Sequence, residues 1–444
     1  MKNKFFSLII SIYLAVSFVG CTDNASKTNT NNPIPSPVSI ENVSDKYYKV
    51  VLDYNSGVSH KEMGRLLGKE IKKKVPHFEK NLDGHLSQLC AAYNLSYSIE
   101  KEVVKKIIKN VDKDYIDELD GLASQLSGDD NSKPGDGKVS KDELYLINLF
   151  IDAAVPVRAS DIPISCSAFS VYGSRSEDGK TITGRHLDWL ITNDHYIEKL
   201  SAVVEYKHGD KSIYSIGPLG VNGVITGFNK DKVFGAIIAS LTDKPCPESF
   251  NNIRSISFDL RYALENNKSL DTAAAYLSDK NNVYSYECNI FLSDPTTSKS
   301  LENDIRGTGT NIRRELRTDT SELNAGIAWD VKDSLATVNA FALKGNHDNM
   351  TNLLANTARW DSYKRLLNAK KSPLNIKDVK EILSFTNVKN GLPGNQDDGS
   401  LYNVASIQSI IFKPDELKLQ VHFAPRNSFP EIKPEFLDIP VDFK

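Results

Sequence analysis

A predicted β-hairpin over residues 165–189 restricts the possible folds of this chain more than any other segment. Two runs of strand-like composition flank Asp178-Gly179, a dipeptide typical of tight hairpin turns. In an antiparallel hairpin, the end of the second strand lies beside the start of the first. We therefore expect the thiol of Cys166, the guanidinium of Arg185 and the carboxylate of Asp188 to lie close together.

Composition excludes several classes of protein. With 40% hydrophobic and 25% charged residues, the 444-residue chain resembles a globular protein with a sizeable core. A formal net charge of −3 gives no electrostatic basis for binding nucleic acid. The five cysteines lack CxxC and Cys/His metal-ligand spacing: Cys21, Cys90, Cys166, Cys246 and Cys288. We therefore predict no disulfide framework, no bound metal and no other cofactor.

The N-terminus has the order of a secretory signal. Two lysines precede an apolar run over residues 5–19, which ends at Gly20-Cys21, a pair that resembles the lipobox of bacterial lipoproteins. We predict a signal peptide over residues 1–21, a lipid on Cys21, and a flexible linker rich in Asn, Thr, Ser and Pro over residues 22–45. The protein is then exported and anchored at the cell surface or the periplasmic face of a membrane. An uncleaved membrane anchor is the alternative.

The rest of the chain divides at Cys166 into two predicted parts. Residues 46–165 show the spacing of amphipathic helices, whereas a period of two dominates residues 166–444 and is interrupted by helices. Predicted helices cover residues 60–75, 82–93, 99–116, 119–126, 141–153, 253–265, 269–277, 356–367 and 376–384. Predicted strands beyond the hairpin cover residues 202–206, 212–216, 223–228, 233–240, 289–292, 336–343, 404–412 and 417–423. This order indicates an α+β architecture in packed layers.

One acidic loop of the N-terminal segment partly matches a calcium-binding helix-loop-helix. Asp136-Gly137 and Glu143 fit the middle and end of that motif, but its first and third positions hold Ser132 and Pro134, which supply no carboxylate. A capping box of Ser140 and Glu143 at the start of the following helix is the better interpretation.

Cys166 is compatible with two kinds of thiol chemistry. A conventional nucleophile needs a histidine base, but strand alternation places His186 on the face opposite Arg185, and Cys166 begins a strand rather than a helix. If the thiol attacked the Ser165 carbonyl and the Ser165–Cys166 bond were cleaved, the new α-amine, with a pKa of roughly 7.7–8.0, could act as the base. Asp188 would orient this amine, and Arg185 would favour the thiolate. An ordinary ion pair between Arg185 and Asp188 on an exposed hairpin is the structural alternative.

The hairpin motifs resemble those of the N-terminal-nucleophile (Ntn) hydrolases of the choloylglycine hydrolase and penicillin acyltransferase group. Cys166-Ser167-Ala168-Phe169 and Gly184-Arg185-His186-Leu187-Asp188-Trp189 are similar to the group's Cys…Gly-Arg-Asn-x-Asp pattern, with His186 in place of the frequent asparagine. The group includes bile salt hydrolases, penicillin V acylase, isopenicillin-N acyltransferase and acid-ceramidase-like amidases. Residues 60–64 and 117–123 resemble the long N-terminal segment of its penicillin-acyltransferase-like branch.

The resemblance extends further down the chain and implies roles there. Gly345-Asn346-His347 is similar to the group's Thr-Asn-His motif, which makes Asn346 the expected donor to the oxyanion. Ala358-Arg359-Trp360 is similar to the segment that carries a second active-site arginine. Residues 223–235 resemble a Gly-Met-Asn segment and imply that Asn229, together with Ser240, is a candidate oxyanion or substrate-binding residue.

Together these motifs imply a four-layer αββα fold preceded by a mostly helical N-terminal segment. They also imply self-cleavage between Ser165 and Cys166 into chains that remain associated, followed by hydrolysis of a small-molecule linear N-acyl amide through a thioester. The expected catalytic residues are Cys166, Arg185, Asp188, Asn346 and Arg359. Acyl transfer, ester hydrolysis of the phospholipase-B-like kind, and non-catalytic ligand binding by a surface lipoprotein are the alternatives. The acyl group, the amine and the oligomeric state are not predicted.

Overall fold

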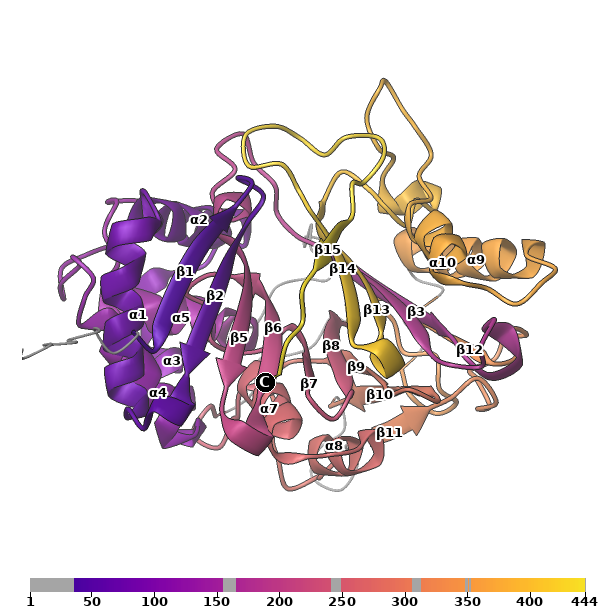
Figure 1. The fold of residues 1–444 in the computed structure, drawn as a ribbon, viewed down its shortest axis with the longest axis horizontal. Helices are drawn as coiled ribbons and strands as arrows, with labels where there is room; N and C mark the ends of the chain where they lie inside the picture. The colour runs from indigo at the N-terminus through magenta and orange to yellow at the C-terminus, as the bar shows by residue number, and fades with distance from the viewer. Residues whose placement is uncertain are drawn as a thin grey trace, which may run out of the picture. The chain divides into compact units, whose positions relative to one another are not determined.

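Two β-sheets form the centre of the structure (Figure 1). The computed structural model describes residues 36–154, 165–240, 249–305, 313–347, 350 and 353–443. Within these residues, sheet A consists in spatial order of β1 (Val38–Val43), β2 (Tyr47–Asp53), β5 (Ser201–Lys207), β6 (Ile213–Pro218), β7 (Thr226–Asn229), β8 (Phe234–Ala239), β9 (Cys288–Ser293), β10 (Ser298–Asp304) and β11 (Arg313–Arg317). Sheet B consists of β12 (Ser334–Thr337), β3 (Ser165–Val171), β4 (Ile182–Asp188), β13 (Ser406–Lys413), β14 (Lys418–Phe423) and β15 (Leu437–Ile439). Apart from the parallel pair β2–β5, neighbouring strands are antiparallel.

Aromatic side chains join the inner faces of the two sheets. The ring centroid of Phe412 on β13 lies 4.3 Å from that of Phe228 on β7 and 5.7 Å from that of Phe234 on β8. Cys166 and Leu187 of sheet B belong to the same buried cluster. The hairpin with the candidate nucleophile therefore lies between two covered faces, and every residue of β3 and β4 is buried.

Helices cover the outer face of each sheet and complete four layers. The helices on the side of sheet A are α1 (His60–Lys74), α2 (Phe78–Ala92), α3 (Tyr97–Ile107), α4 (Lys113–Ala123), α5 (Lys141–Asn148), α6 (Phe150–Ala153), α7 (Ile256–Asn266) and α8 (Leu270–Leu277). On the side of sheet B lie α9 (Leu354–Ala369) and α10 (Ile376–Leu383), which share a core with β3, β4 and β13. The expected αββα fold is confirmed.

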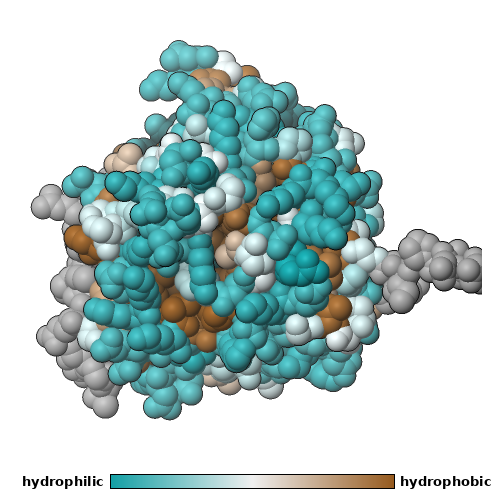
Figure 2. Space-filling view, turned by 90° about the vertical axis from the view of Figure 1, so that its left-hand side faces the viewer, coloured by the Kyte–Doolittle hydropathy of each residue, from teal (hydrophilic) through white to brown (hydrophobic). Residues whose placement is uncertain are grey.

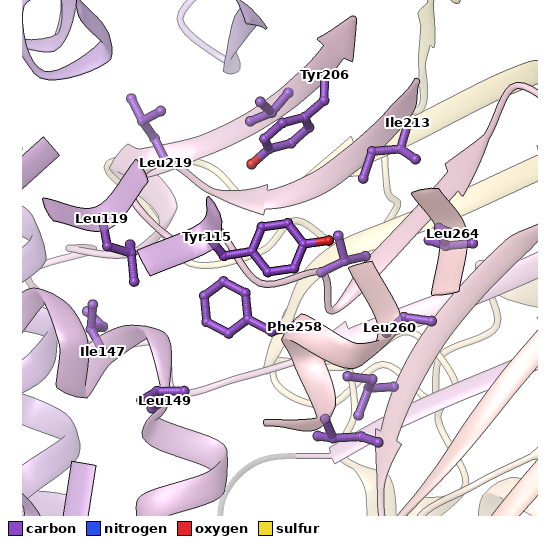
Figure 3. Packing of buried hydrophobic residues seen from close by; sticks show 14 of the residues in the cluster. Tyr115, Leu119, Ile147, Leu149, Tyr206, Ile213, Leu219, Phe258, Leu260 and Leu264 are labelled. Atoms are coloured by element: carbon purple, nitrogen blue, oxygen red, sulfur yellow. The ribbon is translucent and has the colours of Figure 1, made fainter. Parts of the chain in front are cut away.

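The N-terminal segment and the main domain share one core. In Figure 3, Tyr115 and Leu119 of α4 pack near Tyr206 of β5 and Phe258 of α7. The centroids of the Tyr115 and Phe258 rings are 5.6 Å apart. Because contacts hold Pro37–Lys444 together as one unit, the predicted boundary at residue 165 separates no independent core.

The helices of the N-terminal segment begin at local capping signals. The hydroxyl of Ser59 accepts a hydrogen bond from the Glu62 backbone N–H at the start of α1. Ser140 and Glu143 form the expected capping box of α5. The face that carries these helices is largely hydrophilic in Figure 2, with hydrophobic residues set among polar ones, as is typical of amphipathic helices that turn their apolar side to a sheet.

Several predicted boundaries are wrong. The linker expected over residues 22–45 is too long, because Val38–Val43 forms an edge strand paired with β2; residues 22–35 lie outside the described part of the chain. The segment 46–165 is mostly helical, as expected, but it begins with the strand Tyr47–Asp53. The helix expected over 99–116 is interrupted at 108–112, where Asp112 caps a new helix by accepting from the Asp114 N–H.

Strands β10 and β11 have no counterpart among the predicted strands. Their sequences are rich in charged residues, yet Glu302 and Arg317 are fully buried, with Arg317 Nε 2.7 Å from Glu302 Oε1. A buried ion pair hides the alternation of apolar residues on which strand prediction depends.

No helix in the described residues is long and apolar enough to cross a membrane. The predicted signal peptide and the lipidation site Cys21 lie outside those residues. Within the described parts of the chain, no three His, Cys, Asp or Glu side chains form a group suited to a metal ion. In the loop with the partial calcium motif, Asp83 instead accepts the Gly135 and Gly137 N–H groups, each at 2.7 Å.

Candidate active site

Cys166 lies at the start of β3 and is held through its backbone. Its N–H donates to Asn339 Oδ1 at 2.9 Å, and its carbonyl oxygen accepts from Arg359 Nη1 at 2.8 Å. Arg359 Nη2 also donates to Asn339 Oδ1 at 2.9 Å, which links the two supporting side chains. Both polar groups of the Cys166 backbone are thus fixed by residues far away in the sequence.

The thiol of Cys166 faces a buried guanidinium. Arg185 Nη2 lies 3.7 Å from Cys166 Sγ and 3.2 Å from the carbonyl oxygen of Ile237. Arg185 is fully buried, and within the described residues its Nε and Nη1 have no hydrogen-bond partner. Buried donors without partners are rare in folded proteins, so this guanidinium retains capacity to bind the thiolate or an oxygen of a ligand.

Asp188 lies at the end of β4, directly opposite Ser165 in the strand register. Its Oδ1 accepts from Ser406 Oγ at 2.6 Å. Its Oδ2 accepts from Asn403 Nδ2 at 2.9 Å and from Ser165 Oγ at 3.1 Å. The carboxylate is therefore oriented by three side chains beside the Ser165–Cys166 bond.

The structure confirms that the hairpin brings the Arg185 guanidinium to the Cys166 thiol, and it places the Asp188 carboxylate at the neighbouring Ser165. It rejects the alternative of an exposed ion pair. Arg185 and Asp188 are both fully buried, and within the described residues Arg185 donates to Cys166 Sγ and to the Ile237 carbonyl oxygen rather than to Asp188. Strand alternation points Arg185 to the thiol side and Asp188 to the other face. The hairpin loop is longer than the predicted tight turn, since the paired strands end at Val171 and Ile182.

His186 has a structural role, as strand alternation predicted. Its ring nitrogens lie 2.8 Å from Ser409 Oγ and 2.9 Å from the Leu383 carbonyl oxygen, on the side of α10. Burial lowers the pKa of His186 to about 3. A neutral imidazole with both nitrogens engaged cannot serve as the base for Cys166.

Asn346 is not brought to Cys166. Its Nδ2 donates to Glu302 Oε2 at 2.9 Å, and its Oδ1 accepts from Arg313 Nε at 2.8 Å. The prediction that Asn346 is the oxyanion donor must be corrected, because Asn339 is the asparagine that contacts Cys166. Asn339 comes shortly after β12, and its position inside a run predicted as a strand, 336–343, was the one available sequence signal.

The other two candidates occupy different positions. Asn229 holds the end of α7, since its Nδ2 donates to the carbonyl oxygens of Leu264 and Asn267 at 2.9 and 2.8 Å, and it is not part of this site. Ser240 follows β8 directly, and its N–H donates to the Glu287 carbonyl oxygen at 3.0 Å. The preceding carbonyl, that of Ala239, accepts from Asn339 Nδ2 at 2.7 Å, so Ser240 adjoins the site.

Burial dominates the acid–base behaviour of the site. It raises the pKa of the Cys166 thiol, while the charge of Arg185 acts in the opposite direction. Burial also raises the pKa of Asp188, against the charge of Arg359 and the hydrogen bonds from Ser406, Asn403 and Ser165. A thiol with a raised pKa is protonated at neutral pH, so it needs a base before it can act as a nucleophile.

An apolar cavity of about 50 Å³ adjoins the hairpin. Residues from both parts of the chain line it, including Leu89, Phe150 and Ile151 of the N-terminal helices and Leu187, Trp189 and Ile407 of the main domain. Leu187 is the direct neighbour of Cys166 across β3 and β4. At the cavity wall, Trp189 Nε1 donates to His85 Nε2 at 3.0 Å, and burial lowers the pKa of His85 to about 3.

No protein-family model matches the chain, and no curated protein matches it. Three of the solved structures that are similar to it are enzymes. An N-acylethanolamine-hydrolyzing acid amidase ortholog from Caenorhabditis elegans is 16% identical, with a TM-score of 0.40 over 62% of this chain and 100% of that chain. Penicillin V acylase from Agrobacterium tumefaciens is 14% identical, with a TM-score of 0.37 over 62% and 86%.

A mutant form of a conjugated bile acid hydrolase from Clostridium perfringens is 11% identical, with a TM-score of 0.36 over 63% of this chain and 97% of that chain. The candidate site is defined by the contacts of five residues: Cys166, Arg185, Asp188, Asn339 and Arg359.

Proposed function

We propose that the chain is a self-processing N-terminal-cysteine amidase of the Ntn-hydrolase type, which cleaves a linear N-acyl amide through a thioester. One observation carries the proposal. The buried Cys166 begins a strand, with an arginine at its thiol and a fixed carboxylate beside the preceding peptide bond. Among its described contacts there is no histidine that could act as its base, since both ring nitrogens of His186 are engaged elsewhere. An α-amine on Cys166 itself supplies the missing base.

Self-cleavage produces that amine. Cys166 attacks the Ser165 carbonyl, and water then hydrolyses the thioester. The free α-amine, with a pKa of roughly 7.7–8.0, is suited to remove a proton from the thiol near neutral pH. Asn339 and Arg359 continue to hold the Cys166 residue, and Asp188 orients the amine.

The same thiol then attacks the acyl carbonyl of the substrate. The positive charge of Arg185 favours the thiolate at the moment of attack. We assign Asn339, in place of Asn346, as the side chain that stabilises the oxyanion, because its Oδ1 accepts from the Cys166 N–H and so holds the side chain at the nucleophile. The donor is its Nδ2, which binds the Ala239 carbonyl oxygen before cleavage and would turn to the oxyanion in the working enzyme. The amine of Cys166 returns the proton to the leaving nitrogen, and water releases the acyl group.

The apolar cavity beside Leu187 supports an apolar acyl group as the substrate's recognised part. Its walls carry mainly leucine, isoleucine, phenylalanine and tryptophan side chains. Its polar lining residues are hydrogen-bonded within the protein: His85, Trp189, Asn148 and Ser257. Because α2 and α6 line the cavity, the N-terminal chain stays bound after cleavage and forms part of the site. Amides with charged acyl groups are expected to be poor substrates.

The intact mass of the purified protein tests the proposal. We expect two fragments that separate between Ser165 and Cys166 under denaturing conditions and co-elute under native conditions, and Cys166→Ala should give a single chain without acyl release. A panel of N-acyl amides and esters, with and without an amine acceptor, then separates amidase from esterase and from acyltransferase activity. An unprocessed wild-type chain whose Cys166 resists thiol reagents would overturn the proposal.

A further inference from the structure

Ser165 makes a contact that the proposed function does not by itself require. The residue is 1% exposed, and its hydroxyl donates to Asp188 Oδ2 at 3.1 Å. Asp188 Oδ1 is already bound by Ser406, and Oδ2 is shared with Asn403. The residue on the acyl side of the bond to be cleaved is thus hydrogen-bonded to the carboxylate that is expected to receive the new amine.

We infer that Ser165 is a positioning residue for self-cleavage. Before cleavage its hydroxyl binds Asp188, and after the bond is broken the α-ammonium group of Cys166 takes over the same position on Asp188. The inference rests on the proposed function, since it concerns how the same site is formed. The Ser165 side chain then acts in self-cleavage alone and has no part in the later hydrolysis of substrate.

The first step of the reasoning concerns the peptide bond before cleavage. Asp188 holds the Ser165 side of the bond, and Asn339 holds the nitrogen of Cys166 on the other side. Both holders are buried and fixed by further hydrogen bonds. Attack on a carbonyl needs a defined approach, so fixing both halves of the bond keeps the Ser165 carbonyl within reach of Sγ.

The second step concerns the atoms that move. Cys166 Sγ bonds to the Ser165 carbonyl carbon, the carbon–nitrogen bond breaks, and the thiol proton passes to the Cys166 nitrogen. Water then adds to the thioester, which releases the thiol and leaves Ser165 with a carboxylate. At neutral pH the new amine binds a further proton from water and becomes an ammonium group.

The third step explains why the exchange runs in one direction. Cleavage gives Ser165 a carboxylate opposite Asp188 in the strand register, and the two negative charges repel each other, so Ser165 withdraws. An ammonium donor binds a carboxylate more strongly than a hydroxyl does. Asp188 Oδ2 therefore exchanges a neutral donor for a charged one, which orients the amine for its work as a base.

The rate of self-cleavage tests the inference. The full-length chain is made by cell-free translation, synthesis is stopped, and the two fragments are followed over time. We expect Ser165→Ala to slow the appearance of the two fragments by about 10- to 100-fold, the effect of losing one hydrogen bond to a charged group. Ser165→Thr keeps a hydroxyl and should recover most of the rate. Ser167→Ala is the matched control, because Ser167 is an equally buried serine on the same strand whose hydroxyl pairs with Tyr363 at 2.8 Å.

A double-mutant cycle separates positioning from simple loss of stability. In an Asp188→Asn background, where cleavage is already slow, adding Ser165→Ala should cause less than about a threefold further change. Equal cleavage rates for wild type and Ser165→Ala, or equal slowing by Ser165→Ala and Ser167→Ala, would overturn the inference and leave the proposed function standing. If the wild-type chain is never cleaved at the Ser165–Cys166 bond, both the inference and the proposed function fail.

Discussion

Replacing Asn339 tests the assignment that differs most from the sequence-based prediction. In Asn339→Ala, the Cys166 N–H loses its acceptor and the Ala239 carbonyl loses its donor, whereas Arg359 Nη2 loses one of two acceptors and keeps Asn356 Oδ1 at 3.3 Å. Loss of one oxyanion donor lowers kcat by about 10²–10³-fold, or about 2.7–4 kcal/mol. Buried groups left without a partner cost roughly 1–3 kcal/mol each in stability, so the variant should also unfold at a lower denaturant concentration.

Two further variants separate these effects. Asn339→Asp keeps an oxygen that accepts from Cys166 and Arg359 but lacks the NH₂ group, so it should fold and still lose acyl release. Asn346→Ala is the matched control: it loses its bonds to Glu302 and Arg313 and should lower the free energy of unfolding while keeping kcat. The assay is single-turnover acyl release from processed enzyme, alongside denaturant unfolding. Near-wild-type kcat in Asn339→Ala, or a loss confined to Asn346→Ala, would refute the reasoning.

Three other predictions address the thiol, the N-terminal segment and the lipid anchor predicted at Cys21. Arg185→Met removes the charge that opposes the effect of burial on the thiol, so the reactivity of Cys166 with iodoacetamide should shift to higher pH; an unshifted profile would contradict this. His60, although burial lowers its pKa, has a raised pKa overall because it hydrogen-bonds to Glu118 at 2.8 Å. The pKa of His60 in the folded protein lies above its unfolded value of about 6.5. The contribution of His60 to the free energy of unfolding is therefore fully present below about pH 6.5 and is lost as pH rises through the folded pKa. Urea unfolding should thus show a larger loss for His60→Gln at about pH 5.5 than at about pH 9, and a pH-independent difference would rule this out. Cys21→Ser should move the protein from the membrane fraction to the soluble fraction and abolish labelling by a fatty-acid analogue; retained labelling would exclude lipidation at that residue.

The arrangement of the hairpin could be predicted from local sequence information. Turn residues near Asp178-Gly179 and the order of residues along each strand were enough to predict that Cys166, Arg185 and Asp188 meet. Strand alternation also predicted that His186 faces away from Arg185. These predictions hold because side-chain direction in a paired strand depends only on the strand itself and its immediate partner.

The partners of that hairpin could not be predicted in the same way. Asn403 and Ser406, which orient Asp188, lie more than 200 residues from it in the sequence. The sequence points to Asn346 and not to Asn339, because a short motif identifies a residue type and cannot show which of two nearby asparagines contacts Cys166. The strands of Glu302 and Arg317 were missed because a charge pair replaces the apolar pattern.

The sequence alone thus determined that Cys166, Arg185 and Asp188 lie on one hairpin with Arg185 at the thiol, since hairpin geometry is local. Only the tertiary structure decided that these groups are buried rather than exposed, that Asn339 and Arg359 fix the Cys166 backbone, and that N-terminal helices line the cavity. The physical reason is that stacking two sheets between helices brings distant segments together, and the burial this causes sets the pKa values and the unsatisfied donors on which the chemistry depends.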